Sequence, residues 1–166
     1  MDRAQPLYLN PLQLIEFTRF YADEVAAGQY PYIDFDPDDR WHQRIYRDRR
    51  MDVWLISWLP TQGTQLHDHG GSSGSFTVLS GTLTEAVVGG GALHDFDRGA
   101  GQSVGFGAHY VHDVRNVSDA PAVSVHAYSP PLTTMTYYDL EDGRLETITS
   151  LATDDPEPVF DARRAS

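Results

Sequence analysis

Two groups of histidines are the residues of this chain best suited to chemistry. The first is His67-Asp68-His69, and the second lies further along the chain, around His112. Alternate side chains of a β-strand point to the same face, so an H-x-H sequence places both imidazoles together. Two neutral imidazoles that converge from one strand commonly hold a divalent first-row metal ion. A third histidine from another strand would complete the set and leave the opposite side of the metal open for chemistry.

The surroundings of the pair distinguish it from an isolated H-x-H on a surface strand. A turn that ends at Gly63 precedes it, and a glycine-rich segment that ends at Gly81 follows it. This order resembles the first motif of the cupin superfamily, although Gly63 lies closer to the histidines than the opening glycine of that motif. Gly74 stands where many cupins carry a glutamate ligand. The resemblance therefore implies a metal site made of histidines alone, and strand alternation directs Asp68 away from it.

The third histidine comes from a segment that resembles the second cupin motif. Gly101 opens this segment, and His112 with Asn116 closes it, while Gly107 and His109 replace an inner proline and glycine. His112 is at the metal-binding end, so we expect it to be the third ligand. His109 lies three residues earlier, on the opposite face of a regular strand. We expect it at the surface or the rim of the site.

A third polar group lies near the end of the predicted barrel. Strand alternation places Ser124, His126 and Tyr128 on one face. Such a row on its own usually indicates a solvent-exposed face. A Ser129-Pro130-Pro131 segment follows, which requires an extended or turned backbone.

Three separate runs of sequence, in the right order, resemble the cysteine dioxygenase family. They are residues 67–85, 112–118 and 121–131, and the similarity extends over about residues 40–140. The family consists of cupin thiol dioxygenases that hold ferrous iron, Fe(2+), by three histidines. The resemblance implies that the iron ligands are His67, His69 and His112. It also implies an outer-sphere relay of Ser124, His126 and Tyr128, in which Tyr128 reaches the region of substrate and oxygen. The animal enzymes crosslink this tyrosine to a cysteine at the position of Gly74, which this chain cannot do because it has no cysteine.

The substrate carboxylate requires a fixed cation or hydrogen-bond donor. In the family, an arginine on the strand before the first metal motif binds the carboxylate of cysteine, and a glutamine there accompanies 3-mercaptopropionate. Gln43 and Arg44 are adjacent in this chain, so only one of them can face the pocket. An arginine fork forms a bidentate, charge-assisted pair with a carboxylate. We predict that Arg44 binds the substrate, with Gln43 and Arg47 as the alternatives.

The remaining patterns predict an all-β protein with a short N-terminal helical segment, a cupin-type antiparallel β-barrel of jelly-roll type. Asn10 and Pro11 form a typical helix start, and apolar spacing predicts a helix over about residues 11–27. Short strands are predicted at residues 44–47, 51–58, 65–69, 75–79, 82–88, 92–96, 102–106, 111–116, 122–128 and 135–140. We expect one cupin domain over residues 1–166, with its core at about 40–140 and a weakly ordered tail over about 154–166.

Composition and charge argue against some classes of binding partner and against a membrane-spanning protein. The formal net charge of −12 argues against nucleic acid, and no stretch is apolar for long enough to span a membrane. We expect a cytoplasmic protein and a monomer. The resemblance to the cysteine dioxygenase family implies that its partners are a small thiol and O2. It implies an activity that adds both atoms of O2 to the sulfur of L-cysteine, which gives cysteine sulfinic acid. The alternatives are a dioxygenase for 3-mercaptopropionate or another small thiol acid, and a metal- or small-molecule-binding cupin without catalysis.

Overall fold

The one helix described in the computed structural model begins at the predicted position. The structure describes residues 7–30 and 32–156, and within them α1 spans Pro11–Ala26. Asn10 and Gln13 form a capping box, in which each side chain accepts a hydrogen bond from the other residue's backbone N–H at 3.0 Å. These two bonds satisfy N–H groups that the first helical turn leaves without partners. No helix within the described ranges is both long and apolar enough to cross a bilayer.

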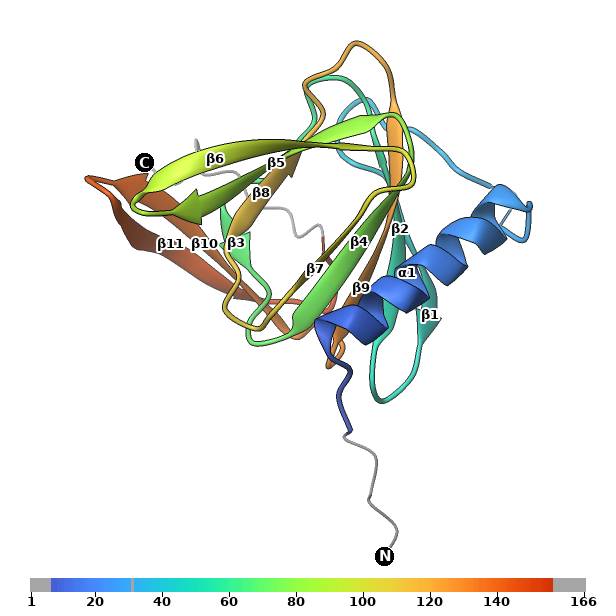
Figure 1. The fold of residues 1–166 in the computed structure, drawn as a ribbon, viewed down its shortest axis with the longest axis horizontal. Coiled ribbons are helices and arrows are strands. Elements are labelled where there is room, and N and C mark those ends of the chain that lie inside the picture. The colour runs from blue at the N-terminus through green and yellow to red at the C-terminus, as the bar shows by residue number, and fades with distance from the viewer. Residues whose placement is uncertain (1–6, 31, 157–166) are drawn as a thin grey trace, which may run out of the picture.

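Two antiparallel sheets form the body of the protein (Figure 1). The sheet next to α1 contains, in spatial order, β1 (His42–Arg47), β2 (Asp52–Trp58), β9 (Ala122–Ser129), β4 (Ser73–Ser80) and β7 (Ser103–Phe106). The other sheet contains, in spatial order, β11 (Arg144–Ala152), β10 (Thr134–Glu141), β3 (His67–Asp68), β8 (His112–Arg115), β5 (Thr82–Gly89) and β6 (Ala92–Gly99). This architecture is the all-β, cupin-type fold that the sequence predicts.

The sheet next to α1 is covered on both faces. Trp54, Ile56 and Trp58 of β2 point into the core between the two sheets. Val53 and Leu55, which alternate with them, belong to a second core under α1. A strand buried on both faces has no need of polar residues, which is why β2 is apolar at almost every position. The polar residues on the inner face of this sheet are therefore exceptional.

Ten of the strands match the predicted segments to within a few residues, but the last one does not. The sequence analysis did not predict β11 (Arg144–Ala152), which pairs with β10 along its whole length. The predicted tail, about residues 154–166, begins with three residues that the structure describes. Asp154, Asp155 and Pro156 fold back toward β1, and Pro156 is buried. Residues 157–166 lie outside the described residues.

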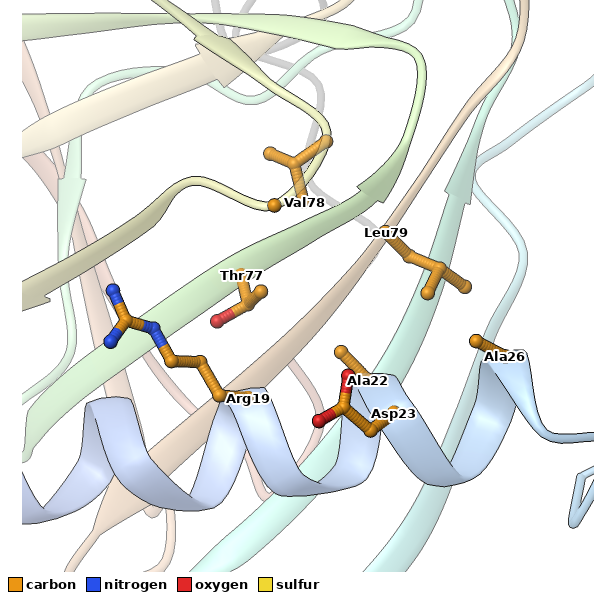
Figure 2. Close-up of a pocket in the computed structure, with 8 residues that line it drawn as sticks. Arg19, Ala22, Asp23, Ala26, Thr77, Val78 and Leu79 are labelled. Carbon is orange, nitrogen blue, oxygen red and sulfur yellow. The ribbon is translucent and has the colours of Figure 1, made fainter.

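A groove lies outside the barrel, between α1 and β4 (Figure 2). Arg19 extends from the helix, and its Nε donates a hydrogen bond to Ser103 Oγ at 3.0 Å. Buried hydroxyls continue this contact, because Thr77 Oγ1 lies 2.7 Å from Ser103 Oγ and 2.8 Å from Thr18 Oγ1. These hydrogen bonds hold the helix against the sheet, and the histidines lie on the other side of that sheet.

Candidate metal centre

The structure brings the three predicted histidines together inside the barrel. His67 and His112 are a directly opposed pair on β3 and β8, so their side chains share one face. His69 follows two residues after His67 and points the same way. One ligand nitrogen from each residue lies within 4.8 Å of the other two, and all three residues are buried. The group fits the facial arrangement expected of a metal centre.

Hydrogen bonds determine which ring nitrogen two of these histidines present. His67 Nδ1 lies 2.7 Å from the carbonyl oxygen of Gln65, and His112 Nδ1 lies 2.9 Å from Oε1 of Glu85. A carbonyl and a carboxylate only accept hydrogen bonds, so Nδ1 carries the proton in both rings. Nε2 is then the nitrogen with a free lone pair, which is the atom that a metal requires.

His69 provides the test of whether a metal fits. Its Nε2 is buried and has no hydrogen-bond partner among the described residues. Burial, followed by repulsion from the neighbouring histidines, holds the pKa values of His67 and His69 well below the usual range. The rings are therefore neutral at neutral pH. A buried, neutral and unsatisfied nitrogen beside two matching lone pairs is explained by a metal ion.

A buried glutamate supports the third histidine, and the sequence analysis did not identify it. Glu85 on β5 is fully buried and accepts hydrogen bonds from His112 Nδ1, Tyr110 Oη at 2.8 Å and Arg98 at 3.0 and 2.8 Å. Burial alone would raise the pKa of Glu85, but these donors outweigh it, so the pKa falls below its usual value. Glu85 is therefore a carboxylate, and Arg98 balances its charge.

The predicted relay residues lie in one row on β9, facing the histidines. Trp58 Nε1 donates to Ser124 Oγ at 2.9 Å, and Ser124 Oγ lies 2.7 Å from His126 Nε2. An indole N–H can only donate, so Ser124 Oγ accepts from Trp58 and is also hydrogen-bonded to His126. The ring of Tyr128 lies 4.9 Å from that of His69 and 6.5 Å from that of His126, centroid to centroid. Trp58, a residue that the sequence analysis did not single out, is thus part of this chain of hydrogen bonds.

The space opposite Tyr128 is filled by an aromatic ring. Gly74 is the cross-strand partner of Tyr128, at the position where the family can carry a cysteine. A Cβ atom at Gly74 would lie 2.4 Å from the ring of Phe106. That ring stacks on His69 with centroids 4.9 Å apart. Glycine is therefore required at position 74 by the packing of Phe106.

The pairing of β1 determines which of the carboxylate-binding candidates face the barrel. Arg44 pairs with Trp54, which pairs with His126, so Arg44 lies on the barrel face. Gln43 pairs with Leu55, whose side chain belongs to the core under α1, so Gln43 lies on the opposite face. The guanidinium of Arg44 lies 5.3 Å from the centroid of the Trp54 ring.

Two further arginines share the barrel side with Arg44. A β-bulge between Arg44 and Tyr46 shifts the register, so that Arg47 faces the same side as Arg44. Arg40, which the sequence analysis did not consider, donates a hydrogen bond to the carbonyl of Gly63 and lies over the Trp58 ring at 5.5 Å. Burial lowers the pKa of His126 to about 3, and the charge of Arg40 contributes to this shift. Arg40 is therefore electrostatically close to the site.

Two residues near the histidines lie apart from the metal group. Asp68 accepts hydrogen bonds from Tyr138 Oη at 2.6 Å and from the backbone N–H of Gly70 at 2.9 Å. It is directed away from the centre, as strand alternation predicts. His109 is exposed in the loop before β8, as predicted.

Comparison with known families agrees with this geometry. The model of the family described as cysteine dioxygenase type I matches residues 20–141. The chain belongs to this family. The match includes the three histidines, the buried glutamate and the Ser-His-Tyr row. The chain is thus a cupin of the thiol dioxygenase class, with a buried three-histidine group suited to a metal ion.

Solved structures show the same fold at low sequence identity. The protein TT1209 from Thermus thermophilus is 24% identical, with a TM-score of 0.55 over 61% of this chain and 93% of that chain. A double-stranded β-helix protein from Klebsiella pneumoniae is 17% identical, with a TM-score of 0.52 over 70% of this chain and 90% of that one. An RmlC-like cupin from Desulfovibrio desulfuricans is 16% identical, with a TM-score of 0.54 over 62% and 93%. These likenesses support the cupin fold.

Proposed function

We propose that this protein is an iron-dependent thiol dioxygenase that converts L-cysteine to cysteine sulfinic acid. The reaction adds both atoms of one O2 molecule to one thiol, so it balances without an external reductant. The observation that carries the proposal is the unsatisfied Nε2 of His69 beside the lone pairs of His67 and His112, in a chain of this family. Ferrous iron held there by His67, His69 and His112 would supply the redox chemistry that lets O2 react with a thiolate.

The histidine set is suited to this chemistry because an imidazole binds a metal ion in its neutral form. Three such ligands would leave the positive charge of the metal available to a thiolate. Glu85 lies behind His112 and makes that imidazole a better electron donor, while Arg98 prevents a net negative charge from accumulating. The rings of His67 and His112 are fixed by their second hydrogen bonds. Their metal-facing nitrogens are therefore positioned before substrate binds.

Tyr128 is placed to act on the substrate side. Its ring packs against His69 and is buried within the core between the sheets. Ser124 holds His126 by a hydrogen bond, so the ring next to Tyr128 has a fixed orientation. In the proposed reaction the phenol donates a hydrogen bond to the substrate or to oxygen, and His126 and Ser124 position it.

The carboxylate of the thiol is assigned to Arg44. The guanidinium lies on the barrel face and is fixed over Trp54, so its fork is held in place before substrate arrives. Holding the carboxylate at a distance from sulfur would leave one orientation for the thiol at the metal. Arg47 and Arg40 are the competing cations on the same side.

The main alternative substrate is 3-mercaptopropionate, for which Gln43 was the expected contact. Gln43 lies on the face under α1 and therefore does not support that alternative. Arg44 would also bind the carboxylate of 3-mercaptopropionate. The choice between the thiols thus depends on the amino group, which cysteine has and 3-mercaptopropionate lacks.

The test is oxygen uptake by the ferrous-loaded protein with and without thiol. We expect uptake that depends on L-cysteine and a sulfinate product identified by mass spectrometry. His69→Ala should abolish it, while His109→Ala, which changes an exposed histidine, should not. Faster turnover of 3-mercaptopropionate than of cysteine would reassign the substrate. Metal binding without thiol-dependent uptake would identify a binding cupin.

A further inference from the structure

The mouth of the histidine site is covered by the end of the described chain. Residues 153–156, which we call the C-terminal strap, follow directly after β11. Thr153 anchors the strap, because its backbone N–H donates to the carbonyl of Thr133 at 2.9 Å. Its hydroxyl also exchanges hydrogen bonds with the backbone of Asp155 at 2.9 and 3.0 Å. The strap is therefore a structured turn.

Pro156 of the strap forms part of the wall of the site. It is buried and lines a cavity together with His67, His112 and Tyr128. The free space in this cavity is about 10 Å³, which is room for about one water. Cysteine is several times larger than a water molecule, so it fits only if a wall of the cavity moves.

The two aspartates of the strap contact a histidine and two arginines of β1. Asp155 Oδ2 lies 2.8 Å from His42 Nε2. Asp154 Oδ2 lies 3.8 Å from Arg44 Nη1 and 3.7 Å from Arg47 Nη1. The strap thus places carboxylates against the same arginine face that the proposed function assigns to the substrate carboxylate.

The ion pairs of Asp154 with Arg44 and Arg47 are weak enough for another carboxylate to replace Asp154. The side chain of Asp154 is 70% exposed, and its distances to the arginines are long for charge-assisted hydrogen bonds. Exposed pairs of this kind contribute about 1 kcal/mol or less. A substrate carboxylate that forms a closer, bidentate pair with Arg44 would displace Asp154.

We propose that the C-terminal strap is a displaceable wall that makes the site selective for thiols with a carboxylate. The strap closes the cavity with Pro156, and Asp154 and Asp155 hold it on Arg44, Arg47 and His42 of β1. The carboxylate of a thiol acid binds Arg44 in place of Asp154 and thereby releases the strap. A thiol without a carboxylate cannot displace Asp154. This inference rests on the proposed function for the identity of the ligand.

Hydrogen–deuterium exchange tests the displacement without turnover. The ferrous-loaded protein is measured anaerobically alone, with L-cysteine and with cysteamine, which lacks the carboxylate. We expect the amide of Thr153, protected by Thr133, to exchange faster with cysteine and to be unchanged with cysteamine. Unchanged protection with cysteine, or equal loss with both thiols, would overturn the proposal.

Kinetics of a strap variant provide the second test. Asp154→Asn with Asp155→Asn should lower the KM for cysteine roughly two- to fivefold, because the substrate no longer competes with weak ion pairs, and should leave kcat nearly unchanged. The control, Asp139→Asn with Glu141→Gln, removes the same charge from exposed positions of β10. An unchanged KM in the strap variant, or the same change in the control, would contradict the proposal. If no thiol is oxidised but cysteine still releases Thr153, the strap proposal is supported and only the proposed function fails.

Discussion

Glu85 Oε1 accepts a hydrogen bond from His112 Nδ1 at 2.9 Å, which places a buried carboxylate directly behind one of the three histidines. His67 has a weaker acceptor at the same position of its ring, since its Nδ1 donates to the carbonyl of Gln65. The group suited to a metal ion contains histidines only, and the negative charge of Glu85 lies behind the ring of His112. His112 is therefore expected to be the strongest electron donor of the three.

Replacing Glu85 tests this support. Glu85→Gln preserves the shape of the side chain but removes its charge and leaves Arg98 without its partner. We expect ferrous affinity to fall by about 10- to 100-fold, measured by competition with a chelator. Glu85→Asp should restore part of the affinity. Asp97→Asn serves as the control, because Asp97 accepts a hydrogen bond from Thr84 on the same pair of strands. An affinity equal to that of the wild type would show that Glu85 has no part in metal binding.

Burial of His126 makes the metal-free protein sensitive to acid. Its pKa is lowered to about 3 in the folded state, mainly by burial, against about 6.5 in the unfolded chain. Well above pH 6.5 the ring is neutral in both states, so His126 does not make the stability depend on pH there. Below it the unfolded chain binds the proton first, so stability falls as the pH drops from about 6.5 toward 3. Between pH 7 and 5 this one residue should remove about 2 kcal/mol of unfolding free energy.

The variant that isolates this effect is His126→Gln. Urea unfolding of the metal-free protein at pH 7 and pH 5 should show a smaller loss than in the wild type, by roughly 2 kcal/mol. The remaining loss comes from the other buried histidines. His109→Gln, at an exposed position, should behave like the wild type. A wild-type stability that is the same at both pH values would contradict the predicted direction.

Gly74 is the position at which packing forbids a side chain. In Gly74→Ala the new methyl group would overlap the ring of Phe106, which is 2.4 Å from the Cβ position. We expect a loss of about 1–3 kcal/mol in unfolding free energy. Gly107→Ala is a matched control, because its Cβ has open space within 4 Å. Relief of the loss by adding Phe106→Leu would confirm the cause, and a neutral Gly74→Ala would disprove it.

The assignment of the substrate carboxylate to Arg44 is tested by its alanine variant. Losing a charge-assisted pair should raise the KM for cysteine by about 10- to 100-fold. Steady-state oxygen uptake measures this change. Arg49→Ala, in the exposed turn of the hairpin, is the control. If Arg40→Ala has the larger effect, the carboxylate lies against Trp58 and not Trp54.

Much of the site could be predicted because strand alternation is a local property. The spacing of His67 and His69, and the even row on β9, place side chains correctly without any knowledge of the fold. Glu85 could have been found in the same way. It alternates with Leu83 and Val87 on one face, and a carboxylate among apolar residues requires buried partners.

Other features could not be predicted from the sequence, because they depart from strand alternation or depend on contacts between residues far apart in the chain. The bulge after Arg44 reverses the face of Arg47, and nothing in the residue types marks it. Strand β11 is mostly polar, although Asp142-Gly143 before it is a typical hairpin turn, with φ of 48° and 76°. The packing of the strap depends on β1, which is far away in the sequence.

The most direct test of the central claim is the fate of heavy dioxygen, labelled in both atoms. The ferrous-loaded protein would be given L-cysteine under this gas, and the mass of the product would be measured by mass spectrometry. The account predicts cysteine sulfinic acid that carries two labelled oxygens, and no product with His69→Ala. A product with one label or none, or no consumption of oxygen by the loaded protein, would contradict it.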